Sequence, residues 1–369
     1  MELIHSSRDA LVRKLQVVSN IVERRNTMPV LANILLRKIG SSLNLLSSDI
    51  EMQIETHIEV DSVEDDVSTT IAARKFLDIL RSLPDEADVL VKLEGRKMLV
   101  QAKKSRFALQ TLPAEDFPLV QEPKEWLTQI TLPQKTLKNL LGMVHFSMAQ
   151  QDLRYYLNGV LLVIDSESVC AVATDGHRLA YAEAEGKNAA GSKHEVIVPR
   201  KTVLELSRLL ADTDDVVTID LASNQAKFTF SDVKLITKLV EGKFPDYQRV
   251  IPKNHQYPVV ISRDALLHSL QRASILTSDK FRGIRWVLSN GTLTIVANNS
   301  DQEEAHDEME VDYQGPEIDV GFNVNYLLDV LNNLKTENVQ FTLQDSNSSA
   351  LVTNLGKEDF KYVVMPMRI

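Results

Sequence analysis

Ser7-Arg8-Asp9-Ala10-Leu11 stands near the start of the chain and is repeated as Ser262-Arg263-Asp264-Ala265-Leu266. Each copy opens a segment whose apolar residues recur at helical spacing; in the first segment they are Leu11, Leu15, Val18 and Val22. Polar residues fall on the opposite face, among them Arg13, Asn20 and Arg24. The repeated phrase therefore predicts two equivalent amphipathic helices that lie far apart in one chain.

A third segment of the same kind follows Pro133, with Leu137, Leu141, Val144 and Met148 as its apolar stripe. Leu11, Leu137 and Leu266 hold matching places in the three segments and lie 126 and 129 residues apart. Alternating strand patterns with turn residues follow each helix, over residues 33–60, 158–184 and 283–311. A second helical segment then begins near Arg74, Arg200 and Asn323, and more strand patterns follow it.

The chain is therefore expected to contain three similar domains, over residues 1–125, 126–253 and 254–369. Each should have two helices and two short antiparallel meanders, which is the make-up of a two-layer α+β domain. Three such domains in a row should form an arc with all helices on one face. An arc of similar units can be closed by a symmetric dimer.

Composition limits the function classes. The chain has 369 residues, 44% hydrophobic content and a net charge of −10, which suits a globular protein and argues against indiscriminate binding to nucleic acid. No apolar run approaches the roughly 20 residues of a membrane span, and no secretion signal is expected at the N-terminus. The single cysteine, Cys170, excludes an intrachain disulfide and suits a reducing cytosol, so a cytoplasmic protein is expected.

Signatures of catalysis are missing from the sequence. The eight histidines have no metal-ligand spacing, and there is no phosphate-binding loop, GxGxxG or GxSxG motif, so no metal and no cofactor is expected. Cys170 lies in the apolar run Val169–Val172, where a buried side chain is favoured over a reactive thiol. Asp175-Gly176-His177-Arg178 could support acid–base chemistry, but Asp-Gly is typical of a turn, and a turn or binding role is favoured.

Three further features leave alternatives open. Tyr155-Tyr156, at the end of the middle helix and beside Gln150 and Gln151, could stack on nucleic acid or divide between core and surface. The basic pairs Arg24-Arg25, Arg74-Lys75 and Arg200-Lys201 recur at helix ends or starts, so they are either ordinary solvated ends or one shared basic surface. The apolar C-terminal segment 362–369 is either a last core strand or the rim of a peptide-binding groove.

Several phrases resemble one known family. They are Arg154-Tyr155-Tyr156-Leu157-Asn158-Gly159, Ala173-Thr174-Asp175-Gly176-His177-Arg178-Leu179-Ala180, Gly242-Lys243-Phe244-Pro245-Asp246-Tyr247, Lys280-Phe281-Arg282-Gly283 and Tyr362-Val363-Val364-Met365-Pro366-Met367-Arg368. The sequence resembles the bacterial DNA polymerase III beta subunit, the replicative sliding clamp. The phrases occur in all three thirds, so the resemblance covers the whole chain.

The resemblance implies the DNA-clamp fold and a head-to-tail homodimer that closes a ring around double-stranded DNA, with helices lining the hole and sheets outside. Such a ring tethers the replicative polymerase and performs no chemistry. Its other implied partners are the clamp loader and clamp-binding proteins of replication and repair, and no membrane is involved. Contacts from lumen Arg and Lys side chains to backbone phosphates would be independent of DNA sequence.

The resemblance also implies three sets of site residues. Those facing DNA are Arg25, Arg74, Gln150, Gln151, Tyr155, Tyr156 and Lys201. Those of a partner-peptide cleft between the second and third domains are Leu157, Thr174, Gly176, His177, Arg178, Leu179, Pro245, Arg249, Val250, Phe281, Asn323, Tyr326, Ser349, Val363, Val364, Met365, Pro366, Met367 and Arg368. Those of the dimer seam are Lys75, Phe107 and Leu109, facing Ile275, Leu276, Glu303 and Glu304. Gln150 and Asn347 stand where the family can have a histidine and an apolar residue, respectively.

Two rival hypotheses remain at this point. One is an enzyme that uses Asp175 and His177 in a cleft. The other is a repeat scaffold that binds proteins but not DNA, which differs from a clamp in having no shared basic face.

Overall fold

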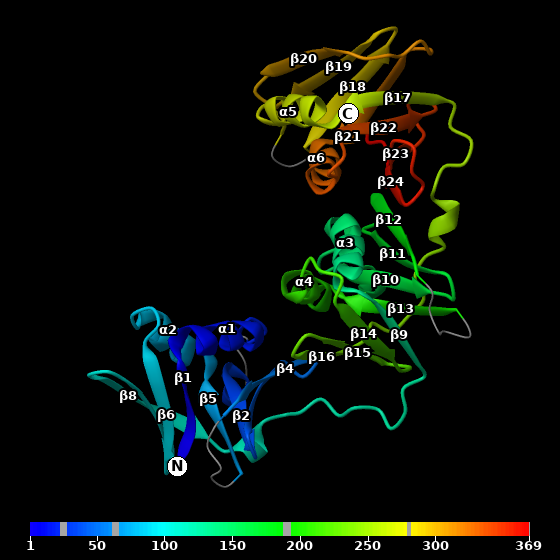
Figure 1. Ribbon diagram of the computed structural model, residues 1–369. Helices are drawn as coiled ribbons and strands as arrows, with labels where there is room; N and C mark the ends of the chain where they lie inside the picture. The colour runs from blue at the N-terminus through cyan, green and yellow to red at the C-terminus, as the bar shows by residue number, and fades with distance from the viewer. Residues whose placement is uncertain (23–27, 61–65, 187–192, 279–281, 369) are drawn as a thin grey trace. The chain divides into compact units, whose positions relative to one another are not determined.

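The computed structural model describes residues 1–22, 28–60, 66–186, 193–278 and 282–368. Within these ranges one order of elements occurs three times: a strand, a helix, three strands, a strand, a second helix and three strands (Figure 1). This order confirms the tandem α+β repeat with two helices and two antiparallel meanders in each third. The sequence patterns did not predict the single strand that precedes each helix.

The bounds of the elements show how closely the thirds correspond. The first third contains β1 (Glu2–Ser7), α1 (Arg8–Ser19), β2 (Asn33–Ile39), β3 (Ser42–Ser48), β4 (Met52–Glu59), β5 (Val67–Ala72), α2 (Ala73–Ser82), β6 (Asp88–Glu94), β7 (Lys97–Ala102) and β8 (Ser105–Leu112). The second contains β9 (Thr128–Pro133), α3 (Gln134–Val144), β10 (Gly159–Ile164), β11 (Ser168–Thr174), β12 (Arg178–Glu185), β13 (His194–Pro199), α4 (Arg200–Leu209), β14 (Val216–Leu221), β15 (Gln225–Phe230) and β16 (Val233–Lys238). The last contains β17 (Tyr257–Ser262), α5 (Arg263–Ser274), β18 (Gly283–Ser289), β19 (Thr292–Asn298), β20 (Glu304–Glu310), β21 (Ile318–Asn323), α6 (Val324–Asn333), β22 (Asn338–Leu343), β23 (Ala350–Asn354) and β24 (Phe360–Val364).

The middle helix is shorter than its apolar stripe suggested. α3 ends at Val144, and the short 3₁₀ helix η3 (His145–Ser147) follows it. Met148 is buried beyond both, so it belongs to the core without being helical. Tyr155 and Tyr156 do not end this helix either, because they belong to a separate 3₁₀ helix, η4 (Tyr155–Leu157).

The repeated Ser-Arg-Asp-Ala-Leu phrase has a structural explanation. Ser7 caps α1 by accepting a hydrogen bond from the backbone N–H of Ala10, and Ser262 caps α5 in the same way through Ala265. The Asp that follows lies in the first helical turn, where its negative charge is favourable.

The first residue of each first helix also binds the C-terminal end of the second helix in its third. Arg8 donates from Nε to the carbonyl of Leu80, and Arg263 donates from Nη1 to the carbonyl of Leu331. Both carbonyls lie in the last turn of their helices, where few intrahelical donors remain; that of Leu80 also accepts from the N–H of Leu83. In the middle third Gln134 takes this place, since its Oε1 accepts from the N–H of Ala211, just beyond α4.

The described residues form two compact units. The first, residues 1–134 and 209–239, holds α1, α2 and a 12-stranded sheet in the order β1-β6-β7-β8-β5-β2-β3-β4-β16-β15-β14-β9. The antiparallel pairing of β16 with β4 joins strands of the middle third to the sheet of the first third. The limits of these units do not coincide with the boundaries expected at 125/126 and 253/254, because strands of the middle third pair with strands of both other thirds. The three-domain division stays a prediction.

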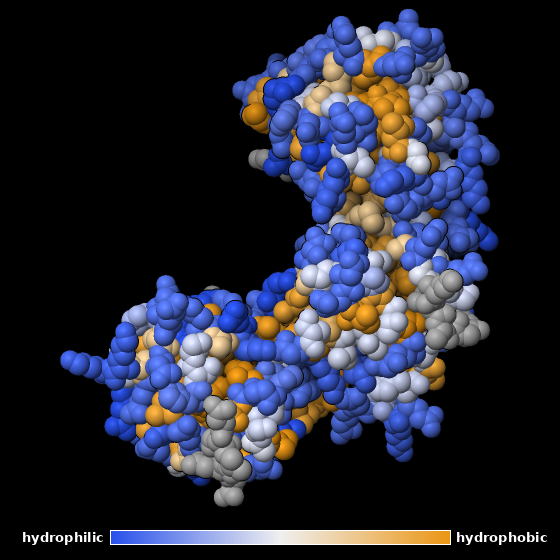
Figure 2. All heavy atoms as spheres, viewed as in Figure 1, coloured by the Kyte–Doolittle hydropathy of each residue, from blue (hydrophilic) through white to orange (hydrophobic). Residues whose placement is uncertain are grey.

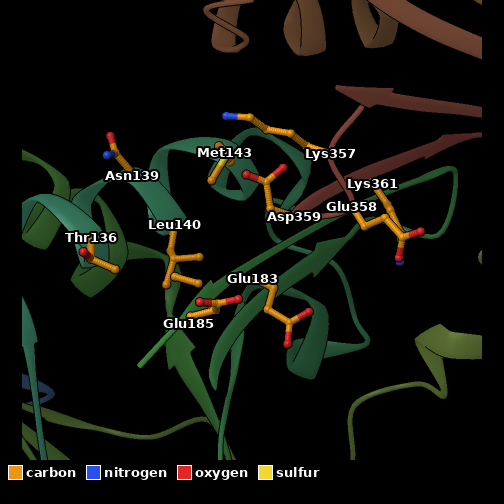
Figure 3. Close-up of a pocket in the computed structure, with 11 residues that line it drawn as sticks. Thr136, Asn139, Leu140, Met143, Glu183, Glu185, Lys357, Glu358, Asp359 and Lys361 are labelled. Carbon is orange, nitrogen blue, oxygen red and sulfur yellow. The ribbon is translucent and has the colours of Figure 1, made fainter. Parts of the chain in front are cut away.

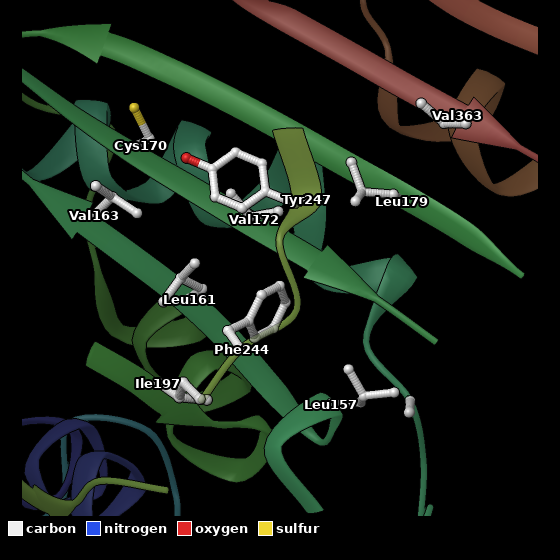
Figure 4. Packing of buried hydrophobic residues seen from close by; sticks show 11 residues of the cluster. Leu157, Leu161, Val163, Cys170, Val172, Leu179, Ile197, Phe244, Tyr247 and Val363 are labelled. Carbon is white, nitrogen blue, oxygen red and sulfur yellow. The ribbon is translucent and has the colours of Figure 1, made fainter. Parts of the chain in front are cut away.

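The second unit, residues 135–208 and 240–369, holds the other helices and two sheets, in the orders β13-β10-β11-β12-β24-β23-β22-β17 and β20-β19-β18-β21. β12 pairs with β24, which joins the middle third to the last. An apolar cluster packs beside this junction, with Leu161, Val172, Phe244 and Val363 among its residues (Figure 4). The C-terminal segment is therefore first a core strand, since Val363 and Val364 are fully buried.

The surface shown in Figure 2 is mainly hydrophilic, with apolar residues in small separate areas. Among the described residues, no helix has both the length and the apolar character needed to span a membrane. The same residues contain no group of three or more His, Cys, Asp or Glu side chains arranged to hold a metal ion.

Candidate functional site

An apolar pocket of about 180 Å³ lies in the second unit, beside the junction of β12 and β24. Its walls come from η4, the β11–β12 turn, the segment around η5 (Tyr247–Arg249) and the C-terminal segment. The residues that line it are Arg154, Leu157, Thr174, Gly176, Arg178, Leu179, Pro245, Tyr247, Val250, Val363 and Met365. Such a small, mostly apolar pocket with a few polar groups suits one or two apolar anchor side chains.

The pocket brings together nine of the residues expected in the peptide cleft: Leu157, Thr174, Gly176, Arg178, Leu179, Pro245, Val250, Val363 and Met365. Arg154 and Tyr247 also line it, although they were not expected. Both occur in the matched phrases 154–159 and 242–247, so that signal was available in the sequence. Figure 4 shows Tyr247, Leu179 and Val363 near one another, with Leu157 farther along the same cluster.

Other expected cleft residues do not line this pocket: His177, Arg249, Asn323, Tyr326, Ser349, Val364, Pro366, Met367 and Arg368. Val364 is fully buried and pairs with Arg178 and Ala350 in the sheet. Arg249 is exposed and forms an ion pair with Asp246. Phe281 lies outside the described residues.

The β11–β12 turn is fixed by Asp175. Its Oδ1 accepts hydrogen bonds from the backbone N–H groups of His177 and Arg178, at 2.9 and 3.1 Å. Its Oδ2 accepts from Nε of Arg178 at 3.1 Å. With both oxygens bound in this way, Asp175 serves the turn that its Asp-Gly sequence predicted.

The next residue of the turn, Gly176, could not be replaced without strain. It has a φ of +90°, and a Cβ there would lie 3.1 Å from the guanidinium of Arg154. Arg154 in turn donates to Asp152 and to the carbonyl of Asp175. The hydrogen bonds from the side chain and backbone of Arg154 to the carboxylate of Asp152 lower its pKa to about 2. This side of the pocket is therefore a loop whose charged groups, Arg154 and Asp152, are paired with each other.

Arg178 lies at the centre of the site and is 9% exposed. Its Nη1 donates to Asp329 on α6, and its Nη2 donates to the carbonyl of Phe146 in η3, both at 2.6 Å. The guanidinium carbon lies 4.4 Å from the ring centroid of Tyr326. Burial by itself lowers the pKa of Arg178, but Tyr362, Asp329 and Asp175 outweigh this effect and raise it, so the group stays charged.

The C-terminal segment is attached at two points. The N–H of Met365 donates to the carbonyl of His177, and the N–H of Met367 donates to the carbonyl of Gly321 on β21. Met365 is 38% exposed and lines the pocket. The segment is therefore both the last core strand and a pocket wall, the two alternatives that the sequence left open.

The residues expected to face DNA lie on several elements. Arg74 is exposed on the first turn of α2, and Lys201 is exposed on the first turn of α4. Gln150, Gln151 and Tyr155 are exposed around η4, and Tyr156 is partly buried. Arg25 lies outside the described residues, as does its neighbour Arg24.

The residues expected at the dimer seam lie on strands and on helices or helix ends. Phe107 and Leu109 are half-buried on β8, which pairs with β7 along its length but with β5 only through Thr111 and Leu112. Glu304 begins β20, an edge strand that pairs only with β19 among the described strands, and Glu303 precedes it. Lys75 is exposed on α2, Ile275 is 76% exposed at the end of α5, and Leu276 is half-buried.

A larger hollow, of about 810 Å³, lies elsewhere in the same unit (Figure 3). It is bounded by one side of α3, the end of β12 and the β23–β24 segment, and it contains the carboxylates of Glu183, Glu185, Glu358 and Asp359. None of the residues expected in a functional site lines it. Its open, mixed-charge lining makes it a poorer receptor for apolar side chains than the smaller pocket.

Known families match the chain along nearly its whole length. Models of the DNA polymerase III beta subunit match it over residues 1–121 for the N-terminal domain, 131–246 for the central domain and 248–368 for the C-terminal domain. The chain belongs to the DNA polymerase III beta subunit family.

Curated relatives and solved structures agree with this family. The beta sliding clamp of Pseudomonas putida is 47% identical over 362 residues, which is 98% of both chains. That of Escherichia coli K12 is 44% identical over 364 residues, again 98% of both. A crystal structure of a Pseudomonas aeruginosa sliding clamp bound to griselimycin has a TM-score of 0.96, 45% identity and full coverage of both chains.

As a member of this family, the chain has its tethering and processivity role in DNA replication. Members of the family are processivity factors without catalytic activity of their own, so the enzyme hypothesis is wrong. This agrees with the use of Asp175 in the turn rather than beside the ring of His177.

Proposed function

We propose that two copies of this chain join head to tail into a ring that encircles double-stranded DNA and holds the replicative polymerase on it. Each copy would contribute the domains 1–125, 126–253 and 254–369. The threefold order of elements and the extents of the three family matches support this division. The ring would act in the cytoplasm, and a single buried cysteine suits that reducing compartment.

The proposed DNA-facing set is Arg25, Arg74, Gln150, Gln151, Tyr155, Tyr156 and Lys201. Arg74 and Lys201 support it because each is exposed at the start of the second helix of its third. Equivalent positions in a repeat would present their charges to the same side of a ring. Contacts of this kind to phosphate do not depend on base sequence, which allows the ring to slide.

The proposed partner site is the apolar pocket around Leu179, Val363 and Met365. Its size and lining suit a short peptide with Leu or Phe anchors, supplied by the polymerase, the clamp loader or other replication and repair proteins. The remaining expected residues, such as His177, Asn323, Tyr326 and Arg368, would contact the peptide outside the pocket.

One observation argues most strongly for the ring: among the described strands, the open part of β8 and the edge strand β20 carry opposite charges. At one end of β8 stand Lys103, Lys104 and Arg106, all exposed. On and before β20 stand Glu303, Glu304, Glu308 and Glu310, all exposed. An open edge tends to pair with another strand, and opposite charges select which edge it pairs with. The edges of one chain therefore suit those of a second copy, through Phe107 and Leu109 on one side and Ile275 and Leu276 on the other.

A charge exchange tests this proposal. One variant has Lys103, Lys104 and Arg106 replaced by Glu; the other has Glu303, Glu304 and Glu308 replaced by Lys. Each variant alone has two edges of the same sign and should be monomeric by light scattering. An equimolar mixture should form a heterodimer, because each seam then joins one acidic and one basic edge. A mixture that stays monomeric, or single variants that remain dimers, would place the seam elsewhere.

A further inference from the structure

The guanidinium of Arg178 joins three parts of the second unit. Nε binds Asp175 in the β11–β12 turn, Nη2 binds the carbonyl of Phe146 in η3, and Nη1 binds Asp329 on α6. Only the last of these bonds reaches the final third of the chain. It is also a charge-assisted bond of 2.6 Å between a buried cation and a carboxylate whose side chain is 43% exposed.

The same residue determines where the pocket wall lies. The carbonyl of Arg178 accepts from Oγ1 of Thr174 at 2.6 Å, and that oxygen accepts from the N–H of Gly176 at 3.1 Å. The carbonyl of His177, the residue between Gly176 and Arg178, accepts a hydrogen bond from the N–H of Met365. Thr174, Gly176 and Met365 all line the pocket, so a shift of Arg178 would move three of its walls.

Asp329 itself does not line the pocket. Through its bond to Arg178, however, Asp329 can act on a bound peptide without lining the pocket. Loss of its carboxylate would leave a buried guanidinium short of one partner, and such a group moves to regain one. Tyr326, on the same helix as Asp329, packs over the guanidinium, with its ring centroid 4.4 Å from the guanidinium carbon. The guanidinium therefore has little room to reach a new partner unless the β11–β12 turn moves with it.

We propose that Asp329 is a positioning residue for the partner-peptide pocket: by binding Arg178 it fixes the β11–β12 turn and, through His177, the wall formed by Met365. This inference rests on the proposed function of the pocket. It assigns to Arg178 an internal role, because each of its three side-chain nitrogens donates to an acceptor within the chain.

The test uses the full chain and a fluorescent peptide copied from the clamp-binding segment of the replicative polymerase. Asp329→Asn should weaken peptide affinity about five-fold to ten-fold, and Asp329→Glu, which keeps the carboxylate, should recover part of it. Asp319→Asn is the matched control, because it breaks another Arg–Asp pair in the same third, with Arg285, whose residues do not line the pocket. It should leave the affinity unchanged.

Two further readouts separate positioning from general loss of stability. In a Met365→Ala background, Asp329→Asn should have a smaller effect, since the wall that it positions is already truncated. Hydrogen exchange at the N–H of Met365 should become faster in Asp329→Asn and not in Asp319→Asn. Equal losses in both Asn variants, full additivity with Met365→Ala, or unchanged exchange at Met365 would overturn the inference. If the unaltered chain did not bind the peptide, the proposed function of the pocket would fail instead, and the exchange measurement would still decide the role of Asp329.

Discussion

Single residues in this chain differ in whether their hydrogen bonds reach near neighbours in sequence or distant parts of the chain. Asp175 and Gly176 form a turn that their sequence predicts, because the bonds involved reach only two or three residues along the chain. The partners of Arg178 were not predictable in this way, since Phe146 and Asp329 lie 32 and 151 residues away. The sequence identified Arg178 as a site residue through resemblance but could not distinguish a peptide contact from an internal one.

Cys170 provides a prediction at this scale. Burial raises the pKa of its thiol, and the side chain lies beside the hydroxyl of Tyr181, which donates to Glu183. Native protein at pH 8 should therefore react with a thiol reagent much more slowly than protein in urea. Equal rates in the two states would show that the thiol is accessible.

The same pKa shift has a consequence for stability. The thiol has a raised pKa in the folded state, so its contribution to stability is fully present below the unfolded value of about 8.5 and is lost as the pH rises through the folded value. The urea midpoint should fall between pH 7 and pH 10, and it should fall less in Cys170→Ala. Tyr181, whose pKa is also raised by burial, should account for part of the remaining decrease. A Cys170→Ala variant with the same pH dependence as the unaltered chain would contradict this assignment.

Helices and strands were predicted best where one periodic face meets the core. α1 and α5 were found because a cap and an acidic residue in the first turn lead directly into an apolar stripe. The strand before each helix was missed because it is short and its pattern merges with the cap; β1, for example, has only six residues. The end of α3 was missed because Met148 continues the apolar spacing after the helix has stopped.

Arg263 allows the link between paired helices to be measured. Arg263→Ala removes the donor to the carbonyl of Leu331 and should lower the free energy of unfolding by about 1 kcal/mol. Arg285→Ala is the control: its side chain is 57% exposed and paired only with Asp319 in the described contacts, so it should cost less than about 0.5 kcal/mol. Equal urea midpoints for the two variants would show that the Arg263 bond contributes no more to stability than an exposed ion pair.

Gly142 offers the opposite change. It lies inside α3, and a Cβ built there meets no atom within 4 Å. Gly142→Ala should therefore stabilise the protein by about 0.5–1 kcal/mol, because alanine loses less conformational entropy in a helix. A lower urea midpoint in this variant would show that the helix needs the glycine at this position.

The C-terminal segment can be separated from the strand before it. A chain that ends at Val364 keeps β24 and its pairing with β12 but loses Met365 and the bonds at His177 and Gly321. It should remain dimeric by light scattering and lose binding of the polymerase peptide in calorimetry. Met365→Ala alone should weaken binding by about 1–2 kcal/mol if Met365 is a central contact. Peptide affinity that survived both changes would move the partner site away from this pocket.

At the scale of the molecule, the order of elements was predictable and the division into units was not. Helix starts and turns depend on neighbours in sequence, so three similar thirds could be inferred from a phrase repeated in two of them and from an equally spaced apolar stripe in the third. The pairings of β16 with β4 and of β12 with β24 depend on which edges meet in space. No local pattern in those strands specifies the partner.

Retention on DNA tests the ring as a whole. Phosphate contacts weaken steeply with salt, by about 10³ in affinity for some six contacts between 50 and 200 mM. A closed ring should nevertheless stay on nicked circular DNA at high salt and leave once the circle is cut. Replacing Arg25, Arg74 and Lys201 by Ala should slow loading and spare retention. Gel filtration of labelled protein decides the matter: equal retention on circular and linear DNA would contradict topological linkage.

The two oppositely charged strand edges, on β8 and β20, could also lead to unwanted polymerisation of the chain. If the two edges pair as proposed, a protomer can add partners at both ends, so every first contact leaves two unpaired edges. Only the geometry between these edges makes the second contact close a cycle; a small change in that geometry would give an open helical filament from the same contacts. An opened ring exposes the same reactive ends. Closure geometry is therefore what separates a ring from a polymer built from the same contacts.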